Sequence, residues 1–182
     1  MAYTKLSKRW FFPAFYYTET VSLSGGGSLQ FVFIDTVLLC GQTHPTLRDL
    51  PPTGPVSDAA AEDQWAWIEQ TLSTSTADWL IVAGHYSGQC TAEDLHRSLP
   101  LPLDLPSLSS HFPNAVWSIG KHGPTSELVK RLRPLLFKYR VSAYFCGHDH
   151  SMQHLREANT TLDYFLVGAG HLTDPSKHHK VR

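Results

Sequence analysis

The pattern of hydrophobic and polar residues predicts an alternation of strands and helices. Four runs rich in β-branched and aromatic residues are typical of strands: 28–40, 77–86, 141–150 and 162–171. Residues 57–73 and 125–140 carry hydrophobic side chains at helical spacing, and Ser57 is placed to cap the first of these helices. Pro134 lies inside the second helix and weakens its middle. The order of elements predicts the α/β class with some parallel pairing.

A glycine followed by a histidine ends three of the predicted strands: 84–85, 147–148 and 170–171. In open α/β sheets ligands bind outside the carboxyl ends of the strands, and glycine lets the backbone approach closely there. We therefore expect His85 and His148 to point into a crevice at this edge of the sheet. Taken alone, His85 would more often be a strand-end histidine bonded to backbone, and His171 is the weakest of the three candidates.

His148 and His150 flank Asp149 directly after a predicted strand. Imidazole is the commonest protein ligand for zinc and also suits iron. Asp149 is placed either to bind a metal or to orient an imidazole. The alternative is a polar turn after a strand, but the second Gly-His pair elsewhere in the chain favours a metal site.

His122 precedes a Gly-Pro pair at the entry to the predicted helix 125–140. A helix N-terminus favours anions, so a phosphate group nearby is physically sensible. A histidine at this place has the chemistry of a proton donor. On the residues alone, a solvated loop histidine is the better interpretation.

Composition limits the class of protein. The chain has 182 residues, 42% of them hydrophobic, which is enough for one domain with a core. Its net charge of −1 gives no argument for binding nucleic acid or an anionic membrane. No apolar run reaches the length of a membrane span, and residues 1–19 lack the unbroken apolar core of a signal peptide. The three cysteines predict no closed disulfide framework, and Cys40 and Cys146 are expected to be buried thiols.

Residues 87–115 interrupt this organisation. Leucine alternates there with proline and serine without a clear period, and the segment is long for a loop inside a compact domain. It is an insertion, a lid or a disordered excursion.

Five segments in order give the sequence a specific resemblance: "VAGHY", "VWSIGKHGPT", "RLRPLL", "CGHDHSMQ" and "GAGHLTDPSK". They resemble the tartrate-resistant (purple) acid phosphatases, which are calcineurin-like metallophosphoesterases. The resemblance implies a β-sandwich flanked by helices and a two-metal centre at the strand ends, with Fe(III) beside Fe(II), Zn or Mn. It further implies hydrolysis of phosphate monoesters, including phosphoproteins, at acid pH in a lysosomal or secreted protein.

The resemblance also assigns roles by position. His85 and His148 match ligands of the divalent metal, and His150 matches a ligand of the ferric ion. His122 matches the histidine that binds phosphate or protonates the leaving alcohol, whereas His171 receives no role. Cys40 matches a half-cystine whose expected partner position holds Glu127, so that disulfide is not expected.

The family's earlier GDxG, GDxxY and GNHD motifs do not occur, nor does its last strand. We therefore interpret residues 1–182 as a partial metallophosphoesterase domain, the C-terminal part of such an enzyme, with an insertion at 87–115 and one sheet edge exposed. Two further interpretations remain open: an inactive fragment that binds one metal weakly or none, and a pseudoenzyme or interaction module that uses 87–115. A calcineurin-like enzyme with other substrates is the alternative within the enzyme class.

Overall fold

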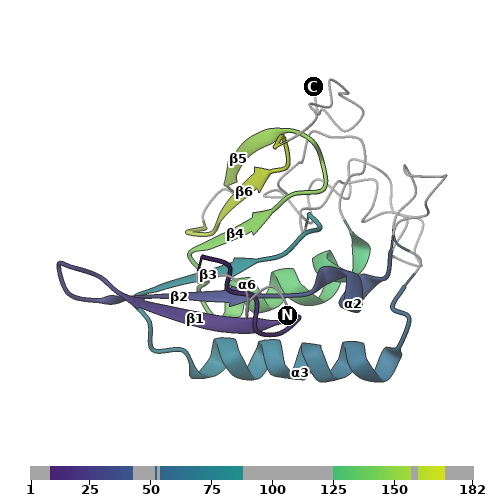
Figure 1. The fold of residues 1–182 in the computed structure, drawn as a ribbon, viewed down its shortest axis with the longest axis horizontal. Coiled ribbons are helices and arrows are strands. Elements are labelled where there is room, and N and C mark those ends of the chain that lie inside the picture. Colours follow the sequence, from purple (N-terminus) through teal and green to yellow (C-terminus); the bar gives the residue numbers. More distant parts are fainter. Residues whose placement is uncertain (1–8, 43–51, 53, 88–124, 157–159, 171–182) are drawn as a thin grey trace.

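One mixed β-sheet organises the chain. The computed structural model describes residues 9–42, 52, 54–87, 125–156 and 160–170. Its six strands are β1 (Tyr17–Ser22), β2 (Ser28–Phe33), β3 (Trp79–Ala83), β4 (Ala143–Cys146), β5 (Met152–Arg156) and β6 (Asp163–Val167). They lie in the order β1-β2-β3-β4-β6-β5 (Figure 1). The four inner strands are parallel, and β1 and β5 pair antiparallel at the two edges.

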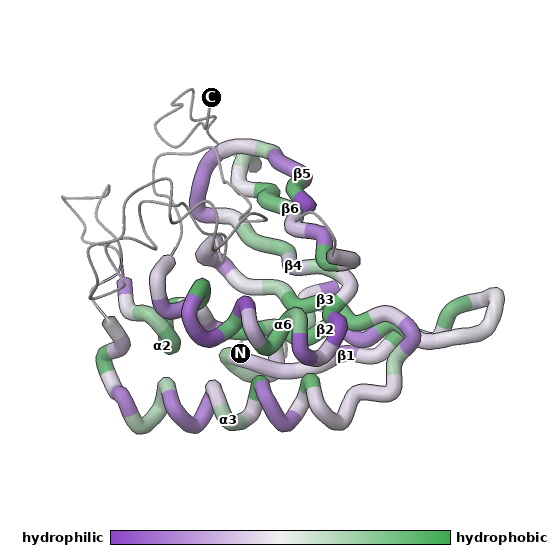
Figure 2. Tube along the Cα trace, turned by 180° about the vertical axis from the view of Figure 1, so that it is seen from behind, coloured by the Kyte–Doolittle hydropathy of each residue, from purple (hydrophilic) through white to green (hydrophobic). Residues whose placement is uncertain are grey.

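The core lies between one face of this sheet and the helices. The helical elements are α2 (Thr36–Cys40), α3 (Asp58–Thr74), the π-helical turn η1 (Leu128–Leu132) and α6 (Arg133–Lys138). Pairing aligns Val32, Val82, Tyr144 and Tyr164 across neighbouring strands on the same face, and all four are buried. They join one hydrophobic cluster with side chains of α3, η1 and α6. Figure 2 shows hydrophobic residues along β3 and β4 and an alternation with hydrophilic residues along α3, as an amphipathic helix requires.

The structure confirms the α/β class, the helix capped by Ser57 and the strands β3, β4 and β6. The described residues form one sheet, and they include no helix that is long and apolar enough to cross a membrane. The edge strands β1 and β5 were not predicted. The predicted irregular segment 87–115 lies outside the described residues apart from Ser87, whose carbonyl accepts a hydrogen bond from the Thr125 N–H at 3.2 Å. The two described residues that flank 88–124, Ser87 and Thr125, are therefore in direct contact.

The prediction of a single strand over 28–40 is wrong in its second half. Its last five residues form α2, because Asp35 turns the chain after β2. The Asp35 carboxylate accepts hydrogen bonds from the N–H groups of Val37 and Leu38, each at 2.9 Å, and Gly41 ends the helix with a φ of 86°. A capping aspartate and a glycine in the left-handed region are local signals for a short helix.

Pro134 changes the predicted helix at 125–140 without ending it. Proline has no N–H and its ring collides with the carbonyl four residues back, so a regular α-helix is excluded at this place. The chain widens into η1 just before the proline, where the Arg133 N–H donates to the carbonyl of Leu128, five residues back. A π-helical turn of this kind accommodates the proline and leaves Leu128, Leu132 and Leu136 facing the core.

Gln64 joins α3 to the turn between β2 and α2. It is fully buried, its side-chain oxygen accepts from the Asp35 N–H at 2.8 Å, and its amide nitrogen donates to the Asp35 carbonyl at 3.0 Å. The Asp35 N–H thus has a side-chain partner, and the Asp35 carbonyl accepts both from Gln64 and from the Leu39 N–H at 3.2 Å, as polar groups shielded from water require.

We expect Gln64→Leu to lower the free energy of unfolding by about 1–3 kcal/mol, because it leaves the Asp35 N–H without a partner and removes one of the two donors to the Asp35 carbonyl. Urea denaturation measures the change. Gln70→Leu, on the exposed side of the same helix, is the matched control and should change stability by less than about 0.5 kcal/mol. Equal effects of the two substitutions would contradict the assignment.

Asp163 holds the β5–β6 hairpin through ionic contacts. Its carboxylate accepts from the Arg156 guanidinium and lies 2.8 Å from His154 Nε2. The hydrogen bond from Arg156 is the main cause that lowers the pKa of Asp163 below its ordinary value of 3.8; burial opposes it, and His154 adds a smaller lowering effect. A lowered pKa in the folded state adds stability above the ordinary value, and this contribution disappears as the pH falls through the lowered pKa.

Wild-type protein should therefore lose more stability between pH 5 and pH 2 than Asp163→Asn does. Denaturant midpoints across this range measure the difference, which should be small because the partners are exposed. Asp63→Asn on the exposed surface of α3 is the control and should follow wild type. Parallel pH profiles for wild type and Asp163→Asn would refute the prediction.

Candidate functional site

Two predicted site residues, His85 and His148, meet at the carboxyl edge of the sheet. Backbone pairing continues past the ends of the parallel strands β3 and β4. The Gly84 N–H donates to the Phe145 carbonyl at 3.0 Å, and the Gly147 N–H donates to the His85 carbonyl at 2.9 Å. The two histidines thus leave the sheet side by side, with His148 Nδ1 3.1 Å from His85 Nε2.

Tyr86 packs beside both imidazole rings. Its ring centroid lies 4.8 Å from that of His148 and 5.2 Å from that of His85, while the two imidazole centroids are 5.0 Å apart. His148 has a φ of 67°, an uncommon left-handed conformation for a residue other than glycine. The chain turns sharply there, so the direction of β4 no longer sets the direction of the residues that follow.

Buried hydroxyl groups fix the backbone that carries His85. The Thr36 hydroxyl accepts hydrogen bonds from the N–H groups of His85 at 3.3 Å and Tyr86 at 3.1 Å. The Tyr144 hydroxyl donates to the Tyr86 carbonyl at 2.7 Å, and the Tyr86 hydroxyl donates to the Gly41 carbonyl at 3.0 Å. Thr36 and Tyr144 are buried, so these bonds are shielded from competing water. Sequence analysis missed both residues, because each lies in a hydrophobic run that reads as core.

The buried cysteines near the site are neutral thiols. Burial, and then the carboxylate of Asp149, raise the pKa of Cys146 to about 12. Burial, and then Glu127, raise the pKa of Cys40 to about 12. Both cysteines are free, which confirms the expectation of buried thiols without a bridge. A thiol at such a pKa is protonated at neutral pH and is a poor nucleophile.

Only some of the other candidate residues lie within the described part of the chain. His150 is exposed, and the described residues contain no group of three or more histidine, cysteine, aspartate or glutamate side chains placed to hold a metal. Asp149 is buried, and its backbone packs closely on Gly168, where an added Cβ would lie 1.9 Å from the Asp149 carbonyl oxygen. His122 and His171 lie outside the described residues.

The geometry of the pair fits two ligands of one metal ion. Two nitrogens bound at about 2.05 Å to the same ion lie about 2.9 Å apart at a right angle and about 3.3 Å apart at the tetrahedral angle. The observed 3.1 Å falls between these values. It also fits a hydrogen bond between two neutral imidazoles. A two-metal centre needs more ligands than the described residues bring together, so it does not fit them.

The curated proteins to which the chain is similar are acid phosphatases. No protein-family model matches it. It is 38% identical to tartrate-resistant acid phosphatase type 5 of Sus scrofa over 180 residues, which is 98% of this chain and 44% of the relative. The Homo sapiens protein of the same name gives 38% over 181 residues, covering 99% and 46%. Purple acid phosphatase 17 of Arabidopsis thaliana is 31% identical over 103 residues, covering 57% and 22%.

The chain thus spans less than half the length of the tartrate-resistant relatives. A solved structure described as GAP50, the anchor in the inner membrane complex of Plasmodium, matches with a TM-score of 0.60 and 21% identity. The match covers 89% of this chain and 40% of that one. At this identity the likeness concerns the fold, and the α/β arrangement of the described elements agrees with it.

We expect Gly84→Ala to disturb the histidine pair. A Cβ at this position would lie 2.7 Å from Thr36 Cγ2 and 3.0 Å from the Tyr144 hydroxyl, the two side chains that hold the backbone of His85 and Tyr86. The cost should be about 1–3 kcal/mol in unfolding free energy, with altered imidazole nitrogen shifts by NMR. Gly25→Ala has open space around its Cβ and should leave both unchanged. Unaltered imidazole shifts in Gly84→Ala would show that the close packing does not position the pair.

Proposed function

We propose that the chain belongs, over the segment that it spans, to the purple acid phosphatase family and carries part of the centre of an acid phosphatase. The proposed reaction is hydrolysis of phosphate monoesters, with phosphoproteins among the substrates. The observation that carries the proposal is the 3.1 Å approach of His85 Nε2 and His148 Nδ1 at the carboxyl edge of the sheet. Family membership also supports a lysosomal or secreted location.

His85 and His148 are proposed as two ligands of the divalent ion, which is iron, zinc or manganese, and His150 as a ligand of a ferric ion. Their imidazole nitrogens suit these metals. In phosphatase chemistry two bound cations neutralise the phosphate and lower the pKa of a bound water. The distance between the two imidazole nitrogens supports the divalent site, whereas only the sequence resemblance supports the role of His150.

His122 is proposed to bind the phosphate group or to protonate the leaving alcohol. It lies three residues before Thr125 in the chain, and the N–H of Thr125 is bonded to the carbonyl of Ser87, two residues after His85. The support for this role is the resemblance of the segment "VWSIGKHGPT", since His122 itself lies outside the described residues.

The presence of two histidine ligands among the described residues favours a second candidate function, which is binding of a single metal ion without catalysis. Two histidines without a third ligand among the described residues suit a weak site for one ion, without the charge needed for phosphate hydrolysis. In that case the chain binds a divalent metal and turns over no phosphate ester. Binding and turnover separate the two candidates.

Titration of the 182-residue chain with Co²⁺, followed by its visible absorption, tests the site. His85→Ala and His148→Ala should each weaken binding by about 100-fold or more, because changes at residues behind a ligand already cost up to that factor. His154→Ala, on the sheet edge, is the matched control and should bind as wild type does. Unchanged binding in both site variants would exclude the histidine pair as a metal site.

Hydrolysis of p-nitrophenyl phosphate at mildly acidic pH, with iron, zinc or manganese added, tests the reaction. The phosphatase proposal expects turnover that disappears in His148→Ala and persists in His154→Ala. Metal binding without turnover would reject it for this chain and support the second candidate. Turnover that both variants retain would place the chemistry elsewhere.

A further inference from the structure

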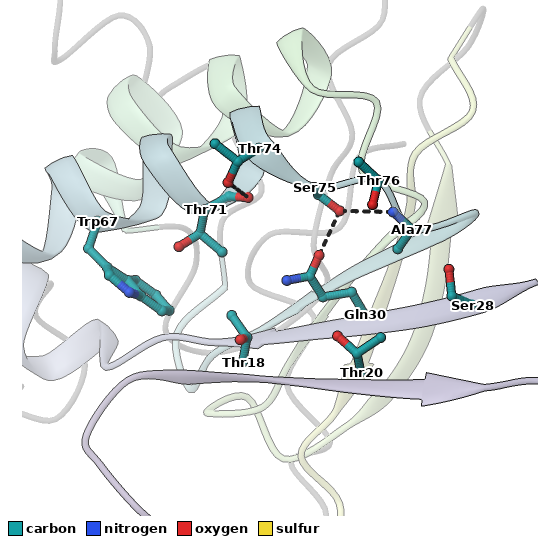
Figure 3. Close-up of a pocket in the computed structure, with 10 residues that line it drawn as sticks. All are labelled: Thr18, Thr20, Ser28, Gln30, Trp67, Thr71, Thr74, Ser75, Thr76 and Ala77. Carbon is teal, nitrogen blue, oxygen red and sulfur yellow. Dashed lines mark hydrogen bonds between the residues drawn. The ribbon is translucent and has the colours of Figure 1, made fainter.

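A polar pocket lies at the end of the sheet opposite the histidine pair. Between the β1–β2 ribbon and the last turns of α3 is a pocket of about 390 Å³. Figure 3 shows hydroxyl and amide groups from both sides reaching into it, with the Trp67 ring at one end. Ser28 at the start of β2 and Ala77 just before β3 line it, whereas His85 follows the far end of β3. The pocket is therefore separate from the candidate metal site.

The pocket arises where the interface between helix and sheet changes from apolar to polar. On β2, Val32 faces the core, but Gln30, two residues earlier on the same face, lines the pocket. On α3, Ile68 and Leu72 are buried, whereas Thr71 lines the pocket beside them. Burial of α3 alone would be served by continued apolar residues, so the polar lining on both sides has to be explained by another role or by contact with water.

The pocket carries no charge. None of the residues that line it is ionisable. A charged ligand would lose hydration there without gaining an ionic partner, so a phosphate group or a charged peptide is disfavoured. The ligand that matches this lining is neutral and rich in hydroxyl groups.

Several hydrogen-bonding groups in the pocket remain available. The Gln30 side-chain oxygen accepts from the Ser75 hydroxyl at 2.6 Å, which fixes the amide, and its nitrogen donates to no other described residue. The hydroxyls of Thr18, Thr20 and Thr71 likewise form no hydrogen bond with a described residue. A fixed amide and three free hydroxyls can together donate to and accept from a set of ligand hydroxyls.

Trp67 adds an apolar surface to these polar groups. Its indole is half-buried and held against Tyr16, with ring centroids 4.8 Å apart. A pyranose ring combines a flat face of C–H groups with a rim of hydroxyls, and it packs that face on an aromatic ring while the rim bonds to polar groups. The volume of 390 Å³ lies within the range of small-ligand pockets and accommodates one or two such rings.

We propose that this pocket binds a neutral sugar of one or two pyranose units. The C–H face stacks on Trp67, the amide nitrogen of Gln30 donates to a sugar hydroxyl, and Thr18 and Thr71 bond to the rim. The site is independent of the proposed phosphatase centre, because it lies at the opposite end of β3 from His85 and its ligand carries no phosphate.

Saturation-transfer difference NMR on the 182-residue chain tests the proposal, with methyl α-D-glucopyranoside, methyl N-acetyl-β-D-glucosaminide and maltose as probes. At least one should bind with a Kd of about 1–10 mM. Thr71→Val and Gln30→Leu should each weaken it by about tenfold or more. Trp67→Ala should abolish it, whereas Trp79→Ala, at an exposed tryptophan outside the pocket, should not. Thermal unfolding of each variant confirms that it is folded.

Three results would overturn the proposal: no binding of any of the three sugars, equal binding by wild type and the Thr71→Val and Gln30→Leu variants, or equal binding by inorganic phosphate that is sensitive to the same variants. Thr71→Val keeps the shape of the side chain on a solvent-facing part of α3, so it tests the pocket even if Trp67→Ala fails to fold. His148→Ala should leave sugar binding unchanged, so failure of the metal site and failure of the sugar site are distinguishable.

Discussion

Parallel pairing of β3 with β4 is the constraint from which the candidate site follows. The pairing of Ala83 with Phe145 continues beyond the strands, through the hydrogen bonds that join Gly84 to Phe145 and Gly147 to His85. A histidine follows each strand at the same edge, and these backbone hydrogen bonds bring the two imidazoles together. The pair is thus preorganised by the sheet, and a metal ion would not have to order this part of the chain when it binds.

The sequence allowed the pair to be predicted but not the complete site. Gly-His at the ends of two predicted strands was sufficient for His85 and His148, since parallel strands end at one edge. The role of His150 stays a prediction, because the left-handed turn at His148 breaks the strand alternation on which a spacing argument would rest. Thr36 was beyond prediction because its role as an acceptor depends on a contact across 49 residues.

The errors in the predicted fold have a similar origin. Residues 28–40 read as one hydrophobic run, yet Asp35 and Gly41 divide it into a strand and a helix through short-range hydrogen bonds. Hydrophobicity reports burial, and both elements are buried, so the run alone cannot distinguish them. At Pro134 a local signal was overruled instead. Packing of the leucines kept the segment helical, and the backbone adapted to the proline by a π-helical turn. Local capping thus determined the structure of residues 28–40, whereas tertiary packing determined the structure around Pro134.

The sheet face turned away from the helices carries a row of aromatic side chains. Phe31 and Phe145 lie there, half-exposed, and stack on Phe33 and Phe165 with ring centroids 5.9 Å and 4.8 Å apart. Stacking reduces the area in contact with water but does not remove it, and water alone is a poor partner for a row of aromatic rings. The β-sandwich expected from the family would place a second layer against such a face. The histidine pair is likewise only part of a larger arrangement, since it supplies two ligands and a two-metal centre requires more. Among the described residues, the packing of this face and the ligand set of the histidine pair are thus both only partly accounted for, the first by its exposed aromatic area and the second by its number of ligands.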